Sequence, residues 1–217
     1  MSRLLETIRF EDGKFSNLLY HQQRMNHSRK ELFGCMDEID LENTLHSAGF
    51  IIRPQRATDL QSGSSELEKA QDLYKCRIIY SEKIEQLEFV PYNLPSINSL
   101  KIIFDDQIDY SHKFNDRTRI NELFEKRENY DDILIVKNGF VADTSVANII
   151  FYNGKKWLTP AHPLLKGTQR AYLLDKELIE AADIRLQDLK YFKKARLINA
   201  MIQFEDKVDI SILNIQA

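Results

Sequence analysis

The sequence predicts an α+β fold, and two features carry that prediction. Strand-like runs follow one another closely in the second half of the chain, separated by Asn-Gly pairs at 138–139 and 153–154. Such pairs between apolar strands are strong signs of tight antiparallel turns. Helical patterns fall between groups of strands and do not alternate regularly with single strands, which argues against a βαβ array. We expect two small subdomains, residues 1–95 and 96–217.

Bulk composition restricts the class of protein without identifying it. The chain has 217 residues, of which 43% are hydrophobic and 29% charged, an ordinary balance for a globular protein. The formal net charge of −3 gives no basis for nucleic-acid binding, and no apolar run is long enough to cross a bilayer. The N-terminus does not resemble a signal peptide, and Cys35 and Cys76 lack metal-ligand spacing. We expect a cytoplasmic protein with reduced thiols and no metal site.

The N-terminal half reads as a hairpin, helices and then strands. In chain order we expect a strand at 4–10, helices at about 19–33, 41–48 and 65–73, and strands at 76–80 and 87–90. Asp12-Gly13 suits a hairpin turn, and Gly34 suits the end of the first helix. Ser65 and Glu68 have the spacing of a capping box.

The C-terminal half is richer in strands. Pro91 and Pro95 impose an extended connection, which is why the subdomain boundary is placed there. Beyond it we expect strands at 100–104, 133–136, 140–141, 148–152, 157–159, 195–198 and 208–212, and helices after Asn115 and from Gly167 to Ala182. The consecutive Asn-Gly turns predict a β-meander within this set.

Lys113 is the first candidate for chemistry. A lysine becomes a useful nucleophile when burial and neighbouring cations favour its neutral form. His112 and Arg117 are possible cations in the same segment, which joins a strand to a helix. Taken alone, a solvated lysine in a charged loop is the more common situation.

Three other features are each weak by themselves. Asp143, at a strand end before small polar residues, suits a charged heterocyclic nitrogen, although such residues also form ordinary turns. Gly167 opens a helix whose free amides could cradle a phosphate, as many ordinary helix starts could. Arg24 shares a helix face with His21 and could bind a phosphate dianion, although an exposed arginine is more common.

Together and in this order, the motifs resemble a known family. The set comprises Glu6-Thr7-Ile8, His21-x-x-Arg24, Lys113 with Asp116-Arg117, Gly139-x-x-x-Asp143-x-x-x-x-Asn148, Thr159-Pro160, Leu165-x-Gly167-x-x-Arg170 and Asn199-Ala200. It is similar to the fold-type IV enzymes that use pyridoxal 5′-phosphate (PLP), namely class IV aminotransferases and 4-amino-4-deoxychorismate lyases. The resemblance implies two small α/β subdomains with the cofactor cleft between them.

The resemblance also implies roles for individual residues. Lys113 matches the Schiff-base lysine, which also moves protons, and Arg24 matches the arginine that holds the cofactor phosphate. Asp143 matches the acid at the pyridine nitrogen, and Asn148 the asparagine that follows it. Further cofactor contacts are implied for Thr168, Gln169, Asn199 and Ala200.

This chain departs from the family pattern at three places. Asp143 stands where glutamate is usual, and Gln169 stands where aminotransferases usually have threonine. The shorter acid requires either a closer strand or a water-mediated contact, and Gln169 leaves only a backbone donor. The usual strand before Glu6-Thr7-Ile8 is also missing, so we expect a smaller N-terminal subdomain.

Three functions remain open from the sequence. The Lys113-x-Asn115-x-Arg117 segment, the Asn199-Ala200 pair and the short chain resemble the lyase branch, which forms 4-aminobenzoate and pyruvate for folate synthesis. A class IV aminotransferase acting on amino acids and 2-oxo acids is the alternative. A non-catalytic relative that serves as a dimeric binding module is the third.

The expected partners follow from the same resemblance. They are a small-molecule amino substrate and a second copy of the chain in a C2 homodimer, with no nucleic acid and no membrane. Candidates for binding substrate carboxylates are Arg9, His27, His112 and Arg117.

Overall fold

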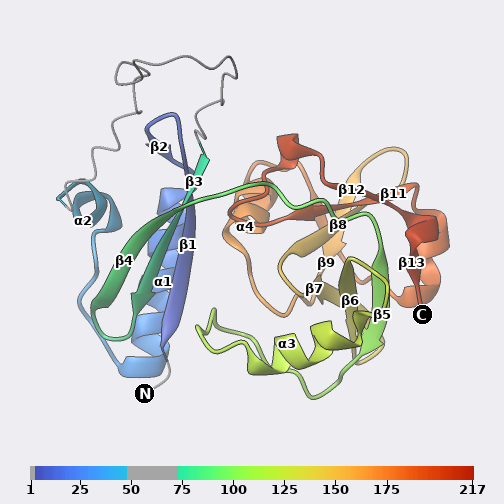
Figure 1. The fold of residues 1–217 in the computed structure, drawn as a ribbon, viewed down its shortest axis with the longest axis horizontal. Coiled ribbons are helices and arrows are strands. Elements are labelled where there is room, and N and C mark those ends of the chain that lie inside the picture. The colour runs from blue at the N-terminus through green and yellow to red at the C-terminus, as the bar shows by residue number, and fades with distance from the viewer. Residues whose placement is uncertain (1–2, 48–72) are drawn as a thin grey trace, which may run out of the picture.

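A four-stranded antiparallel sheet forms the N-terminal part of the molecule. The computed structural model describes residues 3–47 and 73–217 (Figure 1). The strands of this sheet are β1 (Leu4–Glu11), β2 (Lys14–Phe15), β3 (Leu73–Tyr80) and β4 (Ile84–Pro91), in the order β2-β1-β3-β4. Asp12 and Gly13 both have positive φ, 49° and 75°, which is the conformation that closes a tight hairpin with the correct twist. The predicted hairpin is confirmed.

Two helices accompany this sheet. Helix α1 (Leu18–Phe33) ends at Gly34, whose φ of 70° is the left-handed conformation predicted for that glycine. Helix α2 (Leu41–Ser47) follows. Met25 of α1 packs in one apolar cluster with Leu4 and Ile8 of β1, so α1 is held firmly over the strand that carries Glu6.

A nine-stranded mixed sheet forms the rest of the molecule. Its path runs β10-β9-β8-β7-β6-β5-β13, with β11 paired to both β8 and β12. The strands are β5 (Leu100–Phe104), β6 (Asp132–Lys137), β7 (Phe140–Thr144), β8 (Asn148–Tyr152), β9 (Trp157–Pro160), β10 (Glu180–Ala182), β11 (Lys194–Ile198), β12 (Asp209–Ser211) and β13 (Ile215–Gln216). Strands β6 to β9 are consecutive antiparallel neighbours, which confirms the predicted meander.

Short helices complete this part. They are α3 (Thr118–Phe124), α4 (Thr168–Asp175) and the 3₁₀ turns η1 (Glu125–Arg127), η2 (Leu186–Tyr191), η3 (Phe204–Asp206) and η4 (Ile212–Asn214). The mixed helix and sheet content matches the predicted α+β class. The two sheets lie on either side of the connection at 92–99, and the subdomain boundary at residue 95 stays a prediction.

The prediction of a helix from Gly167 to Ala182 is wrong in its second half. Helix α4 ends at Asp175, and Glu177 turns the chain with a φ of 56°. Residues 180–182 then form β10, which pairs in parallel with β9. Ile179 is buried in the cluster that contains Leu173, so packing on the sheet overrides the continuing helical periodicity.

Some predictions concern residues 48–72, which lie outside the described residues. The end of the predicted helix at 41–48 and most of the helix at 65–73 fall there, whereas Leu73 begins β3. Among the described residues, no helix combines the length and apolar composition needed to span a membrane.

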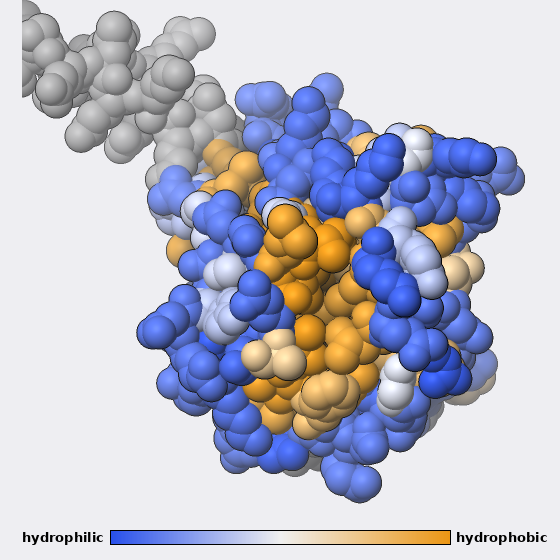
Figure 2. Space-filling view, turned by 90° about the vertical axis from the view of Figure 1, so that its right-hand side faces the viewer, coloured by the Kyte–Doolittle hydropathy of each residue, from blue (hydrophilic) through white to orange (hydrophobic). Residues whose placement is uncertain are grey.

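Apolar surface is concentrated on one side of the larger sheet region. Figure 2 shows it in a hollow framed by hydrophilic surface, on the side that faces away from the N-terminal sheet. Large hydrophobic side chains are also exposed singly, and Leu213 and Met36 are the most exposed of those described. A contiguous apolar area of this kind is typical of a contact surface.

Candidate active site

The segment that carries Lys113 is pinned to β1. The amide of Leu5 donates to the Lys113 carbonyl at 2.9 Å, and the amide of Asn115 donates to the Arg3 carbonyl at 2.9 Å. Leu4 and Phe114 form a bridge between these contacts. The lysine is therefore fixed next to the N-terminal sheet although it is distant from it in sequence.

A pocket brings Lys113 together with most of the residues predicted for the site. It is lined by Arg24, Tyr110, Lys113, Arg117, Ile120, residues 143–148, Leu164, Leu165, Gly167, Thr168, Asn199 and Ala200. The walls come from the first helix, the lysine segment, the β7–β8 turn, the start of α4 and the turn after β11. Gln169 is the one predicted cofactor-binding residue that does not line it.

The pocket favours the neutral form of Lys113. Burial is the largest cause, and the nearby Arg24 guanidinium adds to it, with Arg117 contributing in the same direction. Glu6 opposes these effects, and the net result lowers the pKa of Lys113 from 10.5 to about 7. His112, expected as a neighbouring cation, instead faces Ser28 and Glu31 of α1.

Glu6 is the buried centre of the polar cluster beneath Lys113. Its two carboxylate oxygens accept hydrogen bonds from Arg24, with Nε to Oε1 at 2.9 Å, and Oε2 also contacts His21 Nδ1 at 2.6 Å. Burial alone would raise the pKa of Glu6, but Arg24 and His21 outweigh it and hold the pKa at about 2. Arg24 is thus oriented by an ionised partner.

The same carboxylate determines how His21 is protonated. Burial lowers the pKa of His21 despite the neighbouring Glu6, so the ring is neutral at pH 7. Because Glu6 can only accept, the ring proton lies on Nδ1 and Nε2 is an acceptor. The Thr168 hydroxyl, 3.2 Å from Nε2, must then donate to it. Thr168 therefore has its side-chain proton engaged, and its main-chain amide is the donor that remains for an anion.

The N-terminus of α4 is shaped by Gly167 and Asn148. A Cβ on Gly167 would overlap the Asn148 Oδ1 atom, so only glycine fits here without displacing that side chain. Asn148 Nδ2 donates to Asp143 Oδ1 at 2.7 Å and to the Leu165 carbonyl at 2.8 Å. Gly167 and Thr168 line the pocket, so the N-terminus of α4, a common type of anion site, lies at its wall.

Asp143 is held from two sides. Its Oδ1 accepts from Asn148 and its Oδ2 accepts from the Leu165 amide at 3.0 Å. Burial raises its pKa to about 6 even though these donors favour the ionised form. A carboxylate has about four acceptor sites, so besides these donors and the Leu164 amide it could also bind a protonated heterocyclic nitrogen.

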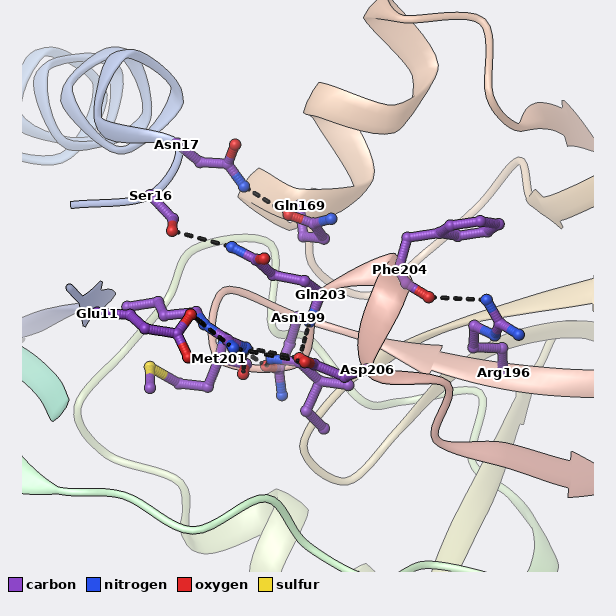
Figure 3. A network of polar contacts seen from close by, with 12 residues as sticks. Glu11, Ser16, Asn17, Gln169, Arg196, Asn199, Met201, Gln203, Phe204 and Asp206 are labelled. Atoms are coloured by element: carbon purple, nitrogen blue, oxygen red, sulfur yellow. Dashed lines mark hydrogen bonds and ion pairs between the residues drawn. The ribbon is translucent and has the colours of Figure 1, made fainter. Parts of the chain in front are cut away.

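The turn at Asn199-Ala200 is tied to the opposite end of the chain. Asn199 Oδ1 accepts from the amides of Met201 and Ile202, and its Nδ2 donates to the Val146 carbonyl. Arg9 of β1 donates to the Met201 carbonyl at 2.9 Å and pairs with Asp206 at 2.6 Å. These contacts belong to the polar network shown in Figure 3.

The network also explains where Gln169 lies. Asn17 Nδ2 donates to Gln169 Oε1 at 2.5 Å, and Gln203 Nε2 donates to Ser16 Oγ at 2.9 Å (Figure 3). Tyr20 adds a hydrogen bond to Asp175 of α4. The Gln169 side chain thus joins the two sheet regions, and a cofactor contact through its main-chain amide stays a prediction.

The four residues predicted as candidates for binding substrate carboxylates differ in whether they reach the pocket. Arg9 is engaged in the network just described, and His27 lies on an exposed face of α1 beside Glu31. His112 contacts Glu31 and Ser28. Arg117 alone among the four lines the pocket.

Glu6 and His21 belong to the motifs of the sequence, but no role was predicted for either. Glu6 is two residues from both Leu4 and Ile8, so in a strand its side chain lies on the same, buried face as theirs. A carboxylate placed among core residues requires a cationic partner. That pattern could have identified the Glu6–Arg24 pair before the structure was known.

Comparisons with known proteins agree with this geometry. The family described as "Amino-transferase class IV" matches residues 111–204. An uncharacterized protein of Haemophilus influenzae is 36% identical over 93% of this chain and 98% of its own. A Schizosaccharomyces pombe protein provisionally named as an aminodeoxychorismate lyase is 29% identical, over 92% of this chain and 86% of its own.

Solved structures show the same fold. A crystal structure from Haemophilus somnus 129pt, provisionally titled a 4-amino-4-deoxychorismate lyase, superposes with a TM-score of 0.80 at 36% identity, covering 94% of this chain and 98% of that one. A PLP-bound hypothetical aminotransferase from Mycobacterium tuberculosis has a TM-score of 0.71 at 18% identity, over 93% and 78%. The fold and pocket define a fold-type IV enzyme scaffold. The chain belongs to the class IV aminotransferase family, which is PLP-dependent.

Proposed function

We propose that this protein is a PLP-dependent lyase that converts 4-amino-4-deoxychorismate to 4-aminobenzoate and pyruvate, in folate synthesis. The observation that carries the proposal is the buried Lys113 with a pKa of about 7, in one pocket with Arg24, Asp143 and the start of α4. The names of the S. pombe relative and the H. somnus structure support the lyase branch.

The residues present fit PLP. Arg24 and the first main-chain amides of α4 would form a phosphate-binding region, and the absence of a Cβ at Gly167 leaves room for the Asn148 side chain beside that helix end. Asp143 supplies a carboxylate for the ring nitrogen and is fixed by Asn148 and Leu165. Asn199 and Ala200 would form the remaining wall of the phosphate region.

The chain's own residues provide what the reaction needs. Bound PLP supplies an electron sink, which allows a proton to leave the carbon next to the substrate nitrogen. Lys113 Nζ would hold the cofactor and, as a neutral amine, would take that proton as the general base. Arg24 and α4 would fix the position of the cofactor relative to Lys113 Nζ. The substrate then divides into 4-aminobenzoate and pyruvate without consuming water or an oxidant.

A product assay tests the reaction. Purified protein loaded with PLP is mixed with 4-amino-4-deoxychorismate, and 4-aminobenzoate and pyruvate are measured by chromatography. Equal amounts of both above the rate of the Lys113→Ala variant are expected. No product above that background would refute the lyase assignment.

Two alternatives give different results in the same preparation. An aminotransferase, supported by the family match and the M. tuberculosis neighbour, would convert an amino acid and a 2-oxo acid but release no 4-aminobenzoate. A non-catalytic relative is suggested by aspartate in place of glutamate at Asp143. Once free PLP has been removed, such a protein would retain no cofactor absorbance and would give no borohydride-trapped adduct at Lys113.

We also propose that the protein is a homodimer. The apolar hollow in Figure 2 supports this proposal because a second copy would cover it. Light scattering coupled to size exclusion tests it, and a mass of one chain at micromolar concentration would contradict it.

A further inference from the structure

Arg117 is a cation of the pocket that has no counter-ion. It stands at the N-cap position of α3 and lines the pocket together with Lys113. Its Nη2 donates to the Ser145 carbonyl at 2.5 Å, which fixes the guanidinium in place. Nε is buried and has no hydrogen-bond partner within the residues that the structure describes.

Neighbouring arginines differ from Arg117 in this respect. Arg24 pairs with Glu6, Arg3 pairs with Glu85 at 2.8 Å, and Arg119 pairs with Asp105 at 2.6 Å and with Glu122. No carboxylate of residues 3–47 or 73–217 lies within ion-pair distance of Arg117. A buried guanidinium donor normally has an acceptor, so an acceptor from a ligand is the natural complement.

The location of Arg117 indicates which part of a ligand it would meet. Besides the Lys113 pocket, it lines a larger open hollow together with Tyr110, Thr118 and Arg119. The phosphate-binding candidates Arg24 and Thr168 line only the inner pocket. Arg117 thus lies between the inner pocket and the outer hollow and lines both, as do Tyr110 and Ile120.

We propose that Arg117 binds a carboxylate of the amine substrate and makes the site selective for amines that carry one. The inference rests on the proposed function, because it assumes that an amine reacts at the cofactor held by Lys113. It adds a specificity-determining residue that serves the lyase and the aminotransferase equally, since the substrates of both carry a carboxylate. Fixed through Nη2 at Ser145, the guanidinium still has unpaired N–H donors, and such a planar fork suits a carboxylate well.

The test compares two ligands and two variants. Calorimetric titration of the PLP-loaded protein measures the Kd of 4-aminobenzoate and of aniline, which lacks the carboxylate. Wild-type protein should bind 4-aminobenzoate more tightly. Arg117→Gln should raise the Kd of 4-aminobenzoate by about tenfold or more, as expected for a lost charge-assisted hydrogen bond. The Kd of aniline should not change.

Arg119→Gln is the matched control. Arg119 lies two residues further on and lines only the outer hollow, and its guanidinium is already paired. This variant should bind both ligands as the wild type does. Circular dichroism on each variant confirms that loss of the Ser145 contact has not unfolded the protein, and Arg117→Lys should recover part of the preference.

Specific results overturn the proposal. Equal affinity of the wild type for both ligands does so, as does an Arg117→Gln variant that keeps the preference. A variant that loses PLP affinity and retains the preference would place Arg117 at the phosphate instead. Borohydride trapping and mass spectrometry of Lys113 report separately on the proposed function. If wild type takes up no PLP, that function fails, and the same titration of the cofactor-free protein still tests Arg117.

Discussion

Lys113 should react as a neutral amine near pH 7, whereas ordinary lysines do not. Its pKa is lowered from 10.5 to about 7, chiefly by burial and then by Arg24. With the ordinary value, about one amine in three thousand is neutral at pH 7, and with the lowered value about half are. At pH 7 the fraction of Lys113 in the neutral form is therefore on the order of a thousandfold larger than that of an ordinary lysine.

Competitive labelling with acetic anhydride followed by peptide mass spectrometry measures this directly. The labelling rate of Lys113 is followed from about pH 5 to about pH 10, with the exposed Lys14 in the same digest as the internal reference. Because the lowered pKa belongs to a base, the rate should rise with pH and level off above about pH 7. A rate for Lys113 that keeps rising in parallel with Lys14 up to the highest pH would refute the reasoning.

Further predictions concern the contacts of Arg24, Asp143 and Gly167 in the pocket. Arg24→Gln should weaken PLP affinity more than it slows the saturated enzyme, and it should destabilise the fold by about 3–5 kcal/mol because Glu6 is left buried and charged. The double variant Glu6→Gln, Arg24→Gln should regain stability in a urea melt but not affinity; recovery of both would contradict the anchoring role. Asp143→Asn should slow proton removal while the borohydride-trapped adduct still forms, and PLP affinity of the wild type should fall as pH drops below about 6, where this carboxylate becomes protonated. A fully active Asn variant would exclude the role. Gly167→Ala should displace Asn148, lower the free energy of unfolding by about 1–3 kcal/mol and weaken PLP binding. Thermal melts and PLP titration measure the two effects, and an unchanged melt would show that the Asn148 side chain moves aside freely.

Local chemistry made much of the fold predictable. The Asn138-Gly139 pair has φ values of 50° and 79°, the conformation that such a pair adopts most easily, and Gly34 closes α1 as its lack of a Cβ allows. The error at the end of α4 has a different origin. Leu174 and Leu178 continue a helical spacing, and only the pairing of β10 with the distant β9 shows that the helix must stop.

The site was predictable in its residue types and not in its electrostatics. The motifs placed Lys113, Arg24 and Asp143 in one chemical group, and the structure brings them into one pocket. The lowered pKa of Lys113 could not be read from its own segment. It depends on burial and on Arg24, which approaches from α1, whereas the neighbouring His112 turns toward Glu31.

The contacts of β1 with the segments at 113–115 and 199–206 have a consequence for the order of folding. Leu5 contacts Lys113, and Arg9 contacts Met201 and Asp206. Contacts between residues so far apart in sequence form slowly, because the intervening chain must lose conformational entropy before they can form. The N-terminal strand must wait for nearly the whole chain to be synthesised before the pocket can exist. A nascent chain released before Asn199 would lack the wall of the pocket that Asn199 and Ala200 form.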